Sequence, residues 1–150
     1  MYNRFLTAVL VFGVAADQLS KYFATRFLSH TYEFVVLPFL MSFQLVHNSG
    51  AAYGIFRGQQ ALLLFVSLSV IFFVVMCQHL FSETKLSQWG ATFLCIGAIG
   101  NFIDRFFLGY VVDFINIHII PVFNIADVCI NIGVACFFLG IIHEYRSQRK

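Results

Sequence analysis

Residues 88–107 read QWGATFLCIGAIGNFIDRFF, an apolar stretch of 20 residues whose two charges, Asp104 and Arg105, come only near its end. An α-helix of this length covers about 30 Å, which matches the hydrocarbon thickness of a bilayer. Three further apolar windows of comparable length lie at about 5–27, 59–80 and 122–142. The sequence therefore predicts four transmembrane helices.

The composition of the whole chain excludes a soluble globular protein. Of its 150 residues 60% are hydrophobic and 11% are charged, against about 45–50% apolar and about 25% charged residues in soluble domains. We therefore predict one integral membrane domain that covers residues 1–150. The net charge of +2 is spread along the chain and forms no basic face, so we expect no nucleic-acid partner.

The distribution of Lys and Arg predicts the orientation of the spans. Cytoplasmic segments of membrane proteins carry an excess of these residues. With both termini in the cytoplasm, the inner side carries Arg4, Lys85, Arg146, Arg149 and Lys150, and the two outer loops carry Arg57 and, at a span end, Arg105. Lys21 and Arg26 then fall at the outer end of the first span, where long side chains can reach the interface. We therefore expect a multi-pass membrane protein with both ends in the cytoplasm.

The first window leaves two interpretations open. The small residues Val14-Ala15-Ala16 are typical of the end of a cleaved leader. The apolar character resumes after Asp17, however, and Asp17 and Lys21 are four residues apart, so each neutralises the other on a continuing helix. We expect the continuing helix.

The long outer connection at residues 28–58 has its own pattern. Its run FLMSFQLV at 39–46 is β-prone, and the small residues of 48–52 follow it. We expect a strand or hairpin on the membrane surface. The predicted fold class is an all-α membrane protein with four transmembrane helices and a small extracytoplasmic β-rich element. The short connection around Ser82–Ser87 makes the second and third spans antiparallel neighbours.

The four aspartates lie in or just beyond the ends of predicted spans, all on the outer side: Asp17, Asp104, Asp113 and Asp127. An unpaired polar group at membrane depth costs several kcal/mol of stability. The placement of the four aspartates therefore indicates that they have a function. Asp127 lies six residues past Pro121, which at about 1.5 Å per residue puts it about 9 Å below the start of the fourth helix, within reach of the interface.

Two asparagines share helix faces with two of these aspartates. Asn101 precedes Asp104 by three residues, and Asn124 precedes Asp127 by three, so the two pairs on facing helices form one polar pocket. An alternative is that intramembrane charges only hold helices together. In that case Asp104 pairs with Arg105, and Asp17 pairs with Lys21.

Asp113 and Asp127 have no Lys or Arg within four residues in the sequence. Two such carboxyl groups brought together cannot both stay ionised, so one holds a proton and the other is a base. This is the arrangement of aspartic peptidases, which need no metal or other cofactor. The chain also lacks H-E-x-x-H and G-x-S-x-G motifs.

Five blocks of the chain resemble a known family. They are DQLSK at 17–21, NSGAAYGIF at 48–56, GAIGNFIDR at 97–105, VVDF at 111–114 and FNIAD at 123–127. In order and spacing they are similar to the motifs of the bacterial lipoprotein signal peptidases (signal peptidase II), aspartic peptidases of family A8. One departure is Tyr53, where the family usually has Phe.

The resemblance assigns roles residue by residue. The catalytic aspartates of the family fall on Asp113 and Asp127. The positions that bind substrate or support the site are Asn48, Gly50, Ala51, Asn101, Asp104, Arg105, Asn124 and Ala126. The first block makes Asp17 and Lys21 a structural polar pair.

The resemblance also implies an activity. The enzyme would cut prolipoproteins on the N-terminal side of a diacylglyceryl-modified cysteine at the outer face of the membrane, among membrane lipids. Sensitivity to the cyclic peptide globomycin is implied in the same way.

Two other classes of protein compete with the peptidase. In a transporter or proton channel, Asp17, Asp104 and Asp127 would be relay sites, which normally spread through the membrane depth rather than gather at one face. In a scaffold protein, the intramembrane Asn and Asp side chains would join helices. That role leaves Asp113 unexplained.

Overall fold

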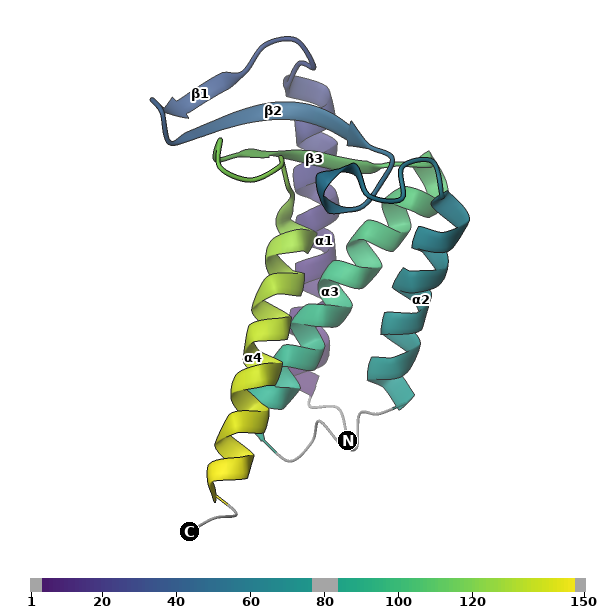
Figure 1. Cartoon of the computed structure of the whole chain (residues 1–150), viewed down its shortest axis with the longest axis vertical. Helices are drawn as coiled ribbons and strands as arrows, with labels where there is room; N and C mark the ends of the chain where they lie inside the picture. The colour runs from purple at the N-terminus through teal and green to yellow at the C-terminus, as the bar shows by residue number, and fades with distance from the viewer. Residues whose placement is uncertain (1–3, 77–83, 148–150) are drawn as a thin grey trace.

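The computed structural model describes residues 4–76 and 84–147. Within these ranges the elements follow in the order α1 (Arg4–Phe27), β1 (Phe34–Leu37), β2 (Met41–Asn48), the short 3-10 helix η1 (Ala52–Gly54), α2 (Gln60–Met76), α3 (Lys85–Leu108), β3 (Val111–Asn116) and α4 (Ile125–Ser147). The helices form a bundle and the sheet lies across one of its ends (Figure 1).

Local signals at both ends of α3 set its length. Thr84 precedes the helix, and its hydroxyl accepts the Ser87 N–H at 3.0 Å, which is N-cap geometry. Gly109 ends the helix with φ +79, a left-handed conformation that glycine adopts at no cost, and its N–H donates to the Arg105 carbonyl at 3.1 Å. The apolar stretch 88–107 is therefore helical throughout, as predicted.

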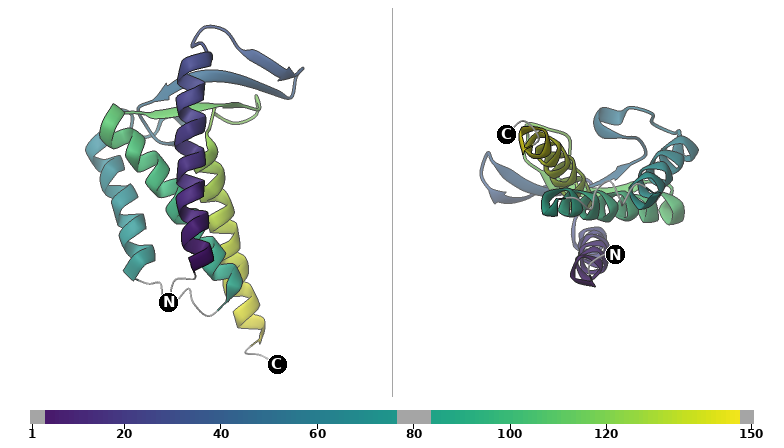
Figure 2. Two further views of the ribbon diagram at one scale, coloured as in Figure 1. Left: turned by 180° about the vertical axis from the view of Figure 1, so that it is seen from behind. Right: turned by 90° about the horizontal axis from the view of Figure 1, so that it is seen from below.

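The helix α3 lies at the centre of the helix bundle and contacts α1, α2 and α4. Seen along the helices in Figure 2, α1 stands on one side of α3, and α2 and α4 stand on the other. The close approach of α3 to α4 and to α1 requires glycine. A Cβ at Gly97 would overlap the backbone oxygen of Ala126 in α4, and one at Gly100 would overlap the Asp17 carboxylate in α1. Three helix faces therefore meet around residues 97–100.

The sheet is antiparallel with the order β1-β2-β3. Strand β2 covers most of the β-prone run at 39–46 and extends two residues beyond it. With β1 it forms a hairpin, as expected within residues 28–58, while β3 was not expected. Strand β3 is buried on both faces apart from Ile115, so it shows no alternation of polar and apolar residues. In the register of β2 with β3, Asp113 pairs with Val46 and Val111 with Asn48, which brings Asn48 within hydrogen-bond distance of Asp113.

The predicted windows agree with the helices, with one shift. The helix α1 continues through Ala15 and Ala16 to Phe27, as expected for a continuing helix. The fourth helix begins at Ile125, not at 122, because Phe123 forms a bridge with Ile115 of β3. The prediction that Asp127 lies about 9 Å into the fourth helix is thus wrong, because Asp127 lies in the first turn of α4.

By length and composition, α3 is the one helix in the described residues that is long and apolar enough to cross a membrane, beside the shorter apolar stretches Gln60–Met76 and Ile125–Gly140. The number of spans stays a prediction. The helices α2 and α3 pack together and run in opposite directions (Figure 1), as predicted. Residues 77–80 of the second window and residues 82–83 of the connection lie outside the described residues.

Candidate active site

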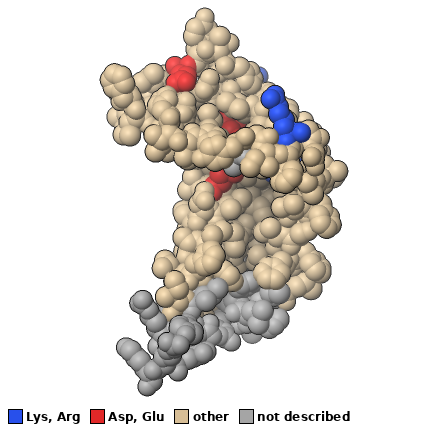
Figure 3. All heavy atoms as spheres, in the orientation of Figure 1, with Lys and Arg blue, Asp and Glu red and all other residues tan. Residues whose placement is uncertain are grey.

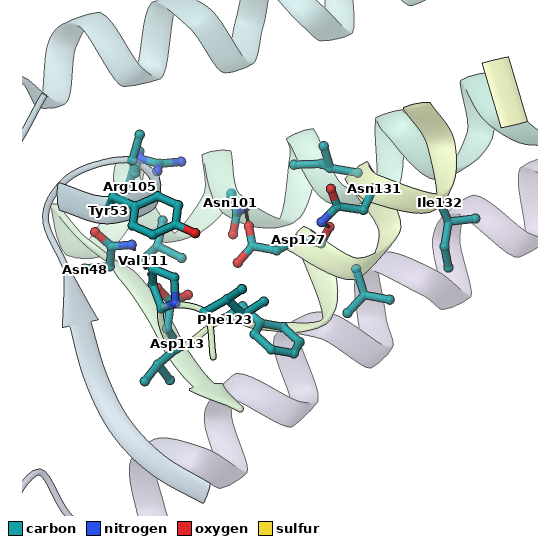
Figure 4. A pocket seen from close by; sticks show the side chains of 16 residues that line it. Asn48, Tyr53, Asn101, Arg105, Val111, Asp113, Phe123, Asp127, Asn131 and Ile132 are labelled. Carbon is teal, nitrogen blue, oxygen red and sulfur yellow. Dashed lines mark hydrogen bonds between the residues drawn. The ribbon is translucent and has the colours of Figure 1, made fainter. Parts of the chain in front are cut away.

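Asp113 and Asp127 line the same pocket, of about 460 Å³, at the junction of the sheet with the helices. Asp113 comes from the middle of β3, and Asp127 comes from the first turn of α4. Figure 4 shows both carboxylates on the pocket wall, with Asn48 beside the first and Asn101 beside the second. The structure thus brings together two carboxyl groups from separate elements, as the sequence predicted.

The Asp113 carboxylate is 1% exposed and accepts two side-chain amide donors. Asn48 Nδ2 donates to Oδ2 at 2.9 Å, and Asn124 Nδ2 donates to Oδ1 at 2.6 Å. Burial, and then the negative charge of Asp127, raise the pKa of Asp113 to about 7, although both amides and the positive charge of Lys21 oppose the rise. This carboxyl group therefore exchanges its proton near neutral pH.

Asp127 has different surroundings. Its Oδ1 accepts Asn101 Nδ2 at 2.9 Å, and its Oδ2 accepts the backbone N–H of Asn124 at 3.2 Å. In return the Asp127 N–H donates to Asn124 Oδ1 at 2.9 Å. This reciprocal pair is a capping box, and an anion in the first turn interacts favourably with the helix dipole. Asp127 is therefore held by two donors in the first turn of α4.

Each asparagine around the two carboxylates has one possible amide orientation. The Gly50 N–H donates to Asn48 Oδ1 at 2.9 Å, so the NH₂ group of Asn48 must face Asp113. The N–H of Asp127 orients Asn124 in the same way. A backbone N–H can only donate, so each contact excludes the flipped amide. The amide donors to Asp113 are thus fixed by the backbone.

A buried ionic cluster lies behind this pocket, between α1 and α3. Lys21 Nζ is 2.8 Å from Asp17 Oδ2, 3.0 Å from Asp104 Oδ2 and 3.1 Å from Asn101 Oδ1. The Asp17–Lys21 pair predicted from the sequence is confirmed. An Asp104–Arg105 pair is wrong, because consecutive residues of a helix point about 100° apart, and Asp104 forms its salt bridge with Lys21.

Arg105 points to the other side of α3, into the pocket wall (Figure 4). Its Nη2 donates to the Gly50 carbonyl at 3.1 Å, which ties the loop after β2 to the helix. Within the loop, the Ala51 N–H donates a hydrogen bond to the Ile55 carbonyl at 2.7 Å. Tyr53 lines the pocket from the same loop and has φ +58, a left-handed conformation that non-glycine residues seldom adopt.

The residues predicted for the site fall into two groups. Those that line the pocket are Asn48, Ala51, Asn101, Arg105, Asp113 and Asp127. Those that lie behind it or beside it are Asp17, Lys21, Gly50, Asp104, Asn124 and Ala126. Ala126, fully buried, contributes its backbone N–H, which donates to Asp17 Oδ1 at 2.8 Å. The second group supports the first.

Two polar residues near the site were not predicted. Gln18 Nε2 donates to Asp17 Oδ2, to Asp104 Oδ1 and to the Gly100 carbonyl, at 3.0–3.2 Å. Asn131 lines the pocket and donates to the Asp127 carbonyl at 3.0 Å. Its spacing of four residues from Asp127 places both on one helix face, and that signal was available in the sequence.

The surface around the pocket is mostly apolar. Acidic atoms lie in the hollow where the sheet meets the helices, and the other charged atoms on this face lie toward the sheet end (Figure 3). The exposed apolar side chains include Phe39 and Phe107, which are 100% and 75% exposed. Exposure of this kind suits a surface whose solvent is lipid. Among the described residues, no group of three or more His, Cys, Asp or Glu is arranged to hold a metal ion.

A family model described as signal peptidase (SPase) II matches residues 9–143. The chain belongs to the signal peptidase II family. Relatives named lipoprotein signal peptidase include one from Microcystis aeruginosa (strain NIES-843 / IAM M-2473), 40% identical over 145 residues that cover 92% of each chain. Another, from Clostridium novyi (strain NT), is 34% identical over 142 residues, covering 91% of this chain and 96% of the relative.

A solved structure described as a bacterial membrane enzyme has the same fold as this signal peptidase II family member. The TM-score is 0.90 at 29% identity, covering 99% of this chain and 93% of that chain. Family and structural likeness agree that the chain is a peptidase and a bacterial membrane protein. The resemblance found in the five sequence blocks is thereby confirmed, and the peptidase is favoured over the relay and scaffold alternatives.

Proposed function

We propose that this peptidase removes signal peptides from prolipoproteins, and that Asp113 and Asp127 are its catalytic pair. The observation that carries the proposal is the placement of two carboxyl groups on one pocket wall, each held by amide donors of fixed orientation. The names of the relatives support the substrate class. Cleavage would fall on the N-terminal side of a diacylglyceryl-modified cysteine.

The two carboxyl groups divide the chemistry. Asp127 acts as the base and takes a proton from a water molecule, whose oxygen attacks the scissile carbonyl carbon. Asp113 carries the shared proton and donates it to the carbonyl oxygen, which gives a tetrahedral diol. The diol then collapses: the C–N bond breaks, Asp127 passes its proton to the leaving amine, and a diol proton returns to Asp113. The products are a carboxylate end and a free amine, and no metal or covalent intermediate is needed.

The environment of each group suits its part. Asp113 is almost fully buried and has a pKa of about 7, so it holds a proton at neutral pH. Asp127 is half-buried at the start of α4, where the helix dipole stabilises a negative charge. A pair of carboxyl groups whose environments differ in this way provides one acid and one base.

We further propose that residues 1–150 form one membrane domain in which α1, α2, α3 and α4 each cross the bilayer. Both termini then lie in the cytoplasm, and the sheet rests on the outer surface of the bacterial inner membrane. A substrate cysteine anchored by two acyl chains would enter sideways between helices, so shallow carboxylates at the interface suit it. We expect a globomycin-type inhibitor to occupy the same pocket.

The test is cleavage of a diacylglyceryl-modified prolipoprotein by the purified protein in detergent. We expect the unaltered chain to cut, and Asp113→Asn and Asp127→Asn to fold and not to cut. Glu33→Gln is the matched control, since it removes a carboxylate that contacts Ser42 and Asn116 of the same sheet, away from the pocket. Normal cutting by either aspartate variant would overturn the pair.

A further inference from the structure

Lys21 makes one contact that a helix-joining role does not require. Its side chain is 3% exposed, and besides Asp17 and Asp104 its ammonium donates to the side-chain oxygen of Asn101 at 3.1 Å. Asn101 is itself 5% exposed, and its other end, Nδ2, donates to Asp127 Oδ1 at 2.9 Å. One amide thus lies between the ammonium and the carboxylate at the pocket.

This contact fixes the Asn101 amide. An ammonium group can only donate, and the second neighbour of Asn101 Oδ1 is the NH₂ group of Asn124 at 3.2 Å, which also only donates. In the flipped amide, the NH₂ of Asn101 would face two donors and its oxygen would face the Asp127 carboxylate. Lys21 is the charged member of this arrangement, and charge-assisted hydrogen bonds are about twice as strong as neutral ones.

We propose that Lys21 is a positioning residue for catalysis: by holding the Asn101 oxygen it orients the amide that donates to Asp127. The proposal rests on the proposed role of Asp113 and Asp127 as the catalytic pair. It gives the ionic cluster between α1 and α3 a function in the reaction in addition to joining these helices.

The carboxylates of Asp17 and Asp104 accept hydrogen bonds from other donors as well, so they keep hydrogen-bond partners without Lys21. Gln18 Nε2 donates to both Asp17 and Asp104. The Ala126 N–H donates to Asp17 at 2.8 Å, and the Val112 N–H donates to Asp104 at 3.0 Å. The Asn101 oxygen, by contrast, has Lys21 as its one charged donor among the described contacts. Loss of Lys21 therefore removes the charged hydrogen bond that orients the Asn101 amide.

The experiment compares variants whose buried cluster carries no more net charge than the cluster of the unaltered protein. Lys21→Met alone leaves two carboxylates without their counter-ion, so it is made in the Asp17→Asn background and compared with Asp17→Asn itself. Gln18→Leu is the structural control, because it weakens the same junction of α1 and α3 and does not contact Asn101. Each protein is assayed in detergent with the lipid-modified substrate for kcat, KM, melting temperature and pH profile.

We expect Asp17→Asn/Lys21→Met to lose about 100-fold in kcat relative to Asp17→Asn, the cost of a misplaced reacting group, with KM nearly unchanged. The alkaline limb of the pH profile should move to higher pH, because the charge of Lys21 lowers the pKa of Asp113. Gln18→Leu should lower the melting temperature and leave the pH profile in place. A double variant with the kcat and limb of Asp17→Asn would show that Lys21 only joins helices.

A conservative replacement separates orientation from charge. In Asp17→Asn/Lys21→Gln the new amide can donate to Asn101, so kcat should recover, while the alkaline limb stays displaced. If the Met variant does not fold, this Gln variant decides: a folded protein whose kcat stays far below that of Asp17→Asn overturns the proposal. If Asp113→Asn still cuts, the proposed function and this inference fall together. If Asp113→Asn is inactive and the Lys21 variants match their reference, only this inference falls.

Discussion

Asn124 and Asp127 exchange two hydrogen bonds across the first turn of α4. The Asp127 N–H donates to Asn124 Oδ1 at 2.9 Å, and the Asn124 N–H donates to Asp127 Oδ2 at 3.2 Å. The NH₂ group of the same Asn124 donates to Asp113 at 2.6 Å. The residue that begins the helix therefore also links the two carboxyl groups, so helix capping and site geometry depend on one side chain.

Substitution of Asn124 separates these two roles. Asn124→Ser keeps an oxygen that accepts the Asp127 N–H, so its melting temperature in detergent should stay close to that of the unaltered protein. Asn124→Ala loses the cap and should lose about 1 kcal/mol of stability. Both lose the donor to Asp113, and both should lose about 100-fold in kcat. A Ser variant of normal activity would show that the amide donor does not matter.

Stability should fall as pH rises, because of Asp113. Its pKa is about 7 in the folded protein, against an ordinary value of 3.8. Between these values the folded protein binds a proton that the unfolded chain has released, so the free energy of unfolding decreases with pH. The decrease is up to about 4 kcal/mol and ends above pH 7 or so.

The measurement for this prediction is the melting temperature in detergent between pH 4 and pH 8. Asp113→Asn has no titratable group at this position. Its melting temperature should therefore change less between pH 4 and pH 8 than that of the unaltered chain. Glu33→Gln should follow the unaltered chain. Parallel curves for Asp113→Asn and the unaltered protein would mean that Asp113 does not titrate near neutrality.

Activity should show an alkaline limb for the same reason. Asp113 must carry a proton to donate it to the substrate carbonyl, and its pKa of about 7 means that the protonated fraction falls above that pH. We expect kcat/KM to decrease about tenfold per pH unit beyond the limb. Rates measured from pH 5 to pH 9, with protein stability checked at each pH, test this. A rate that stays level to pH 9 would contradict the assignment of Asp113 as the acid.

Much of the helical fold could be predicted, because apolar length is a strong signal. The end of the first window coincides with the end of α1 at Phe27, and α3 extends the 88–107 window by a few residues at its start. Asp17 and Lys21 were predicted as a pair from their spacing alone. These features depend on neighbours in the sequence, so local pattern suffices for them.

The rest depends on contacts between distant residues. Strand β3 carries Asp113, yet it is identified as a strand only through its register with β2. The salt bridge between Lys21 and Asp104 joins two helices, and no spacing within one helix predicts it. The start of α4 moved because Phe123 pairs with β3 before the helix begins. Tertiary contacts decided each of these cases.

The bond from Arg105 to the Gly50 carbonyl leads to a last prediction. It is the tie between α3 and the loop of residues 49–59, whose base is closed by the Ser49 carbonyl accepting from the Gly58 N–H and from Gln60 Nε2. Without Arg105 the loop should open more often, and the Gly50 N–H should hold Asn48 less firmly toward Asp113. Trypsin cleavage after the exposed Arg57 reports this opening directly.

Arg105→Met should therefore be cut by trypsin several-fold faster and should lose both substrate affinity and kcat, because loop and dyad are linked through Asn48. Arg105→Lys is the matched control, since it keeps the positive charge near both aspartates and loses the planar guanidinium that reaches the carbonyl. If the bond matters, Lys should behave like Met in the trypsin assay and keep the alkaline limb of the unaltered protein. Equal trypsin rates for all three proteins would show that the loop is held by its own hydrogen bonds, with Arg105 acting on the dyad through its charge alone.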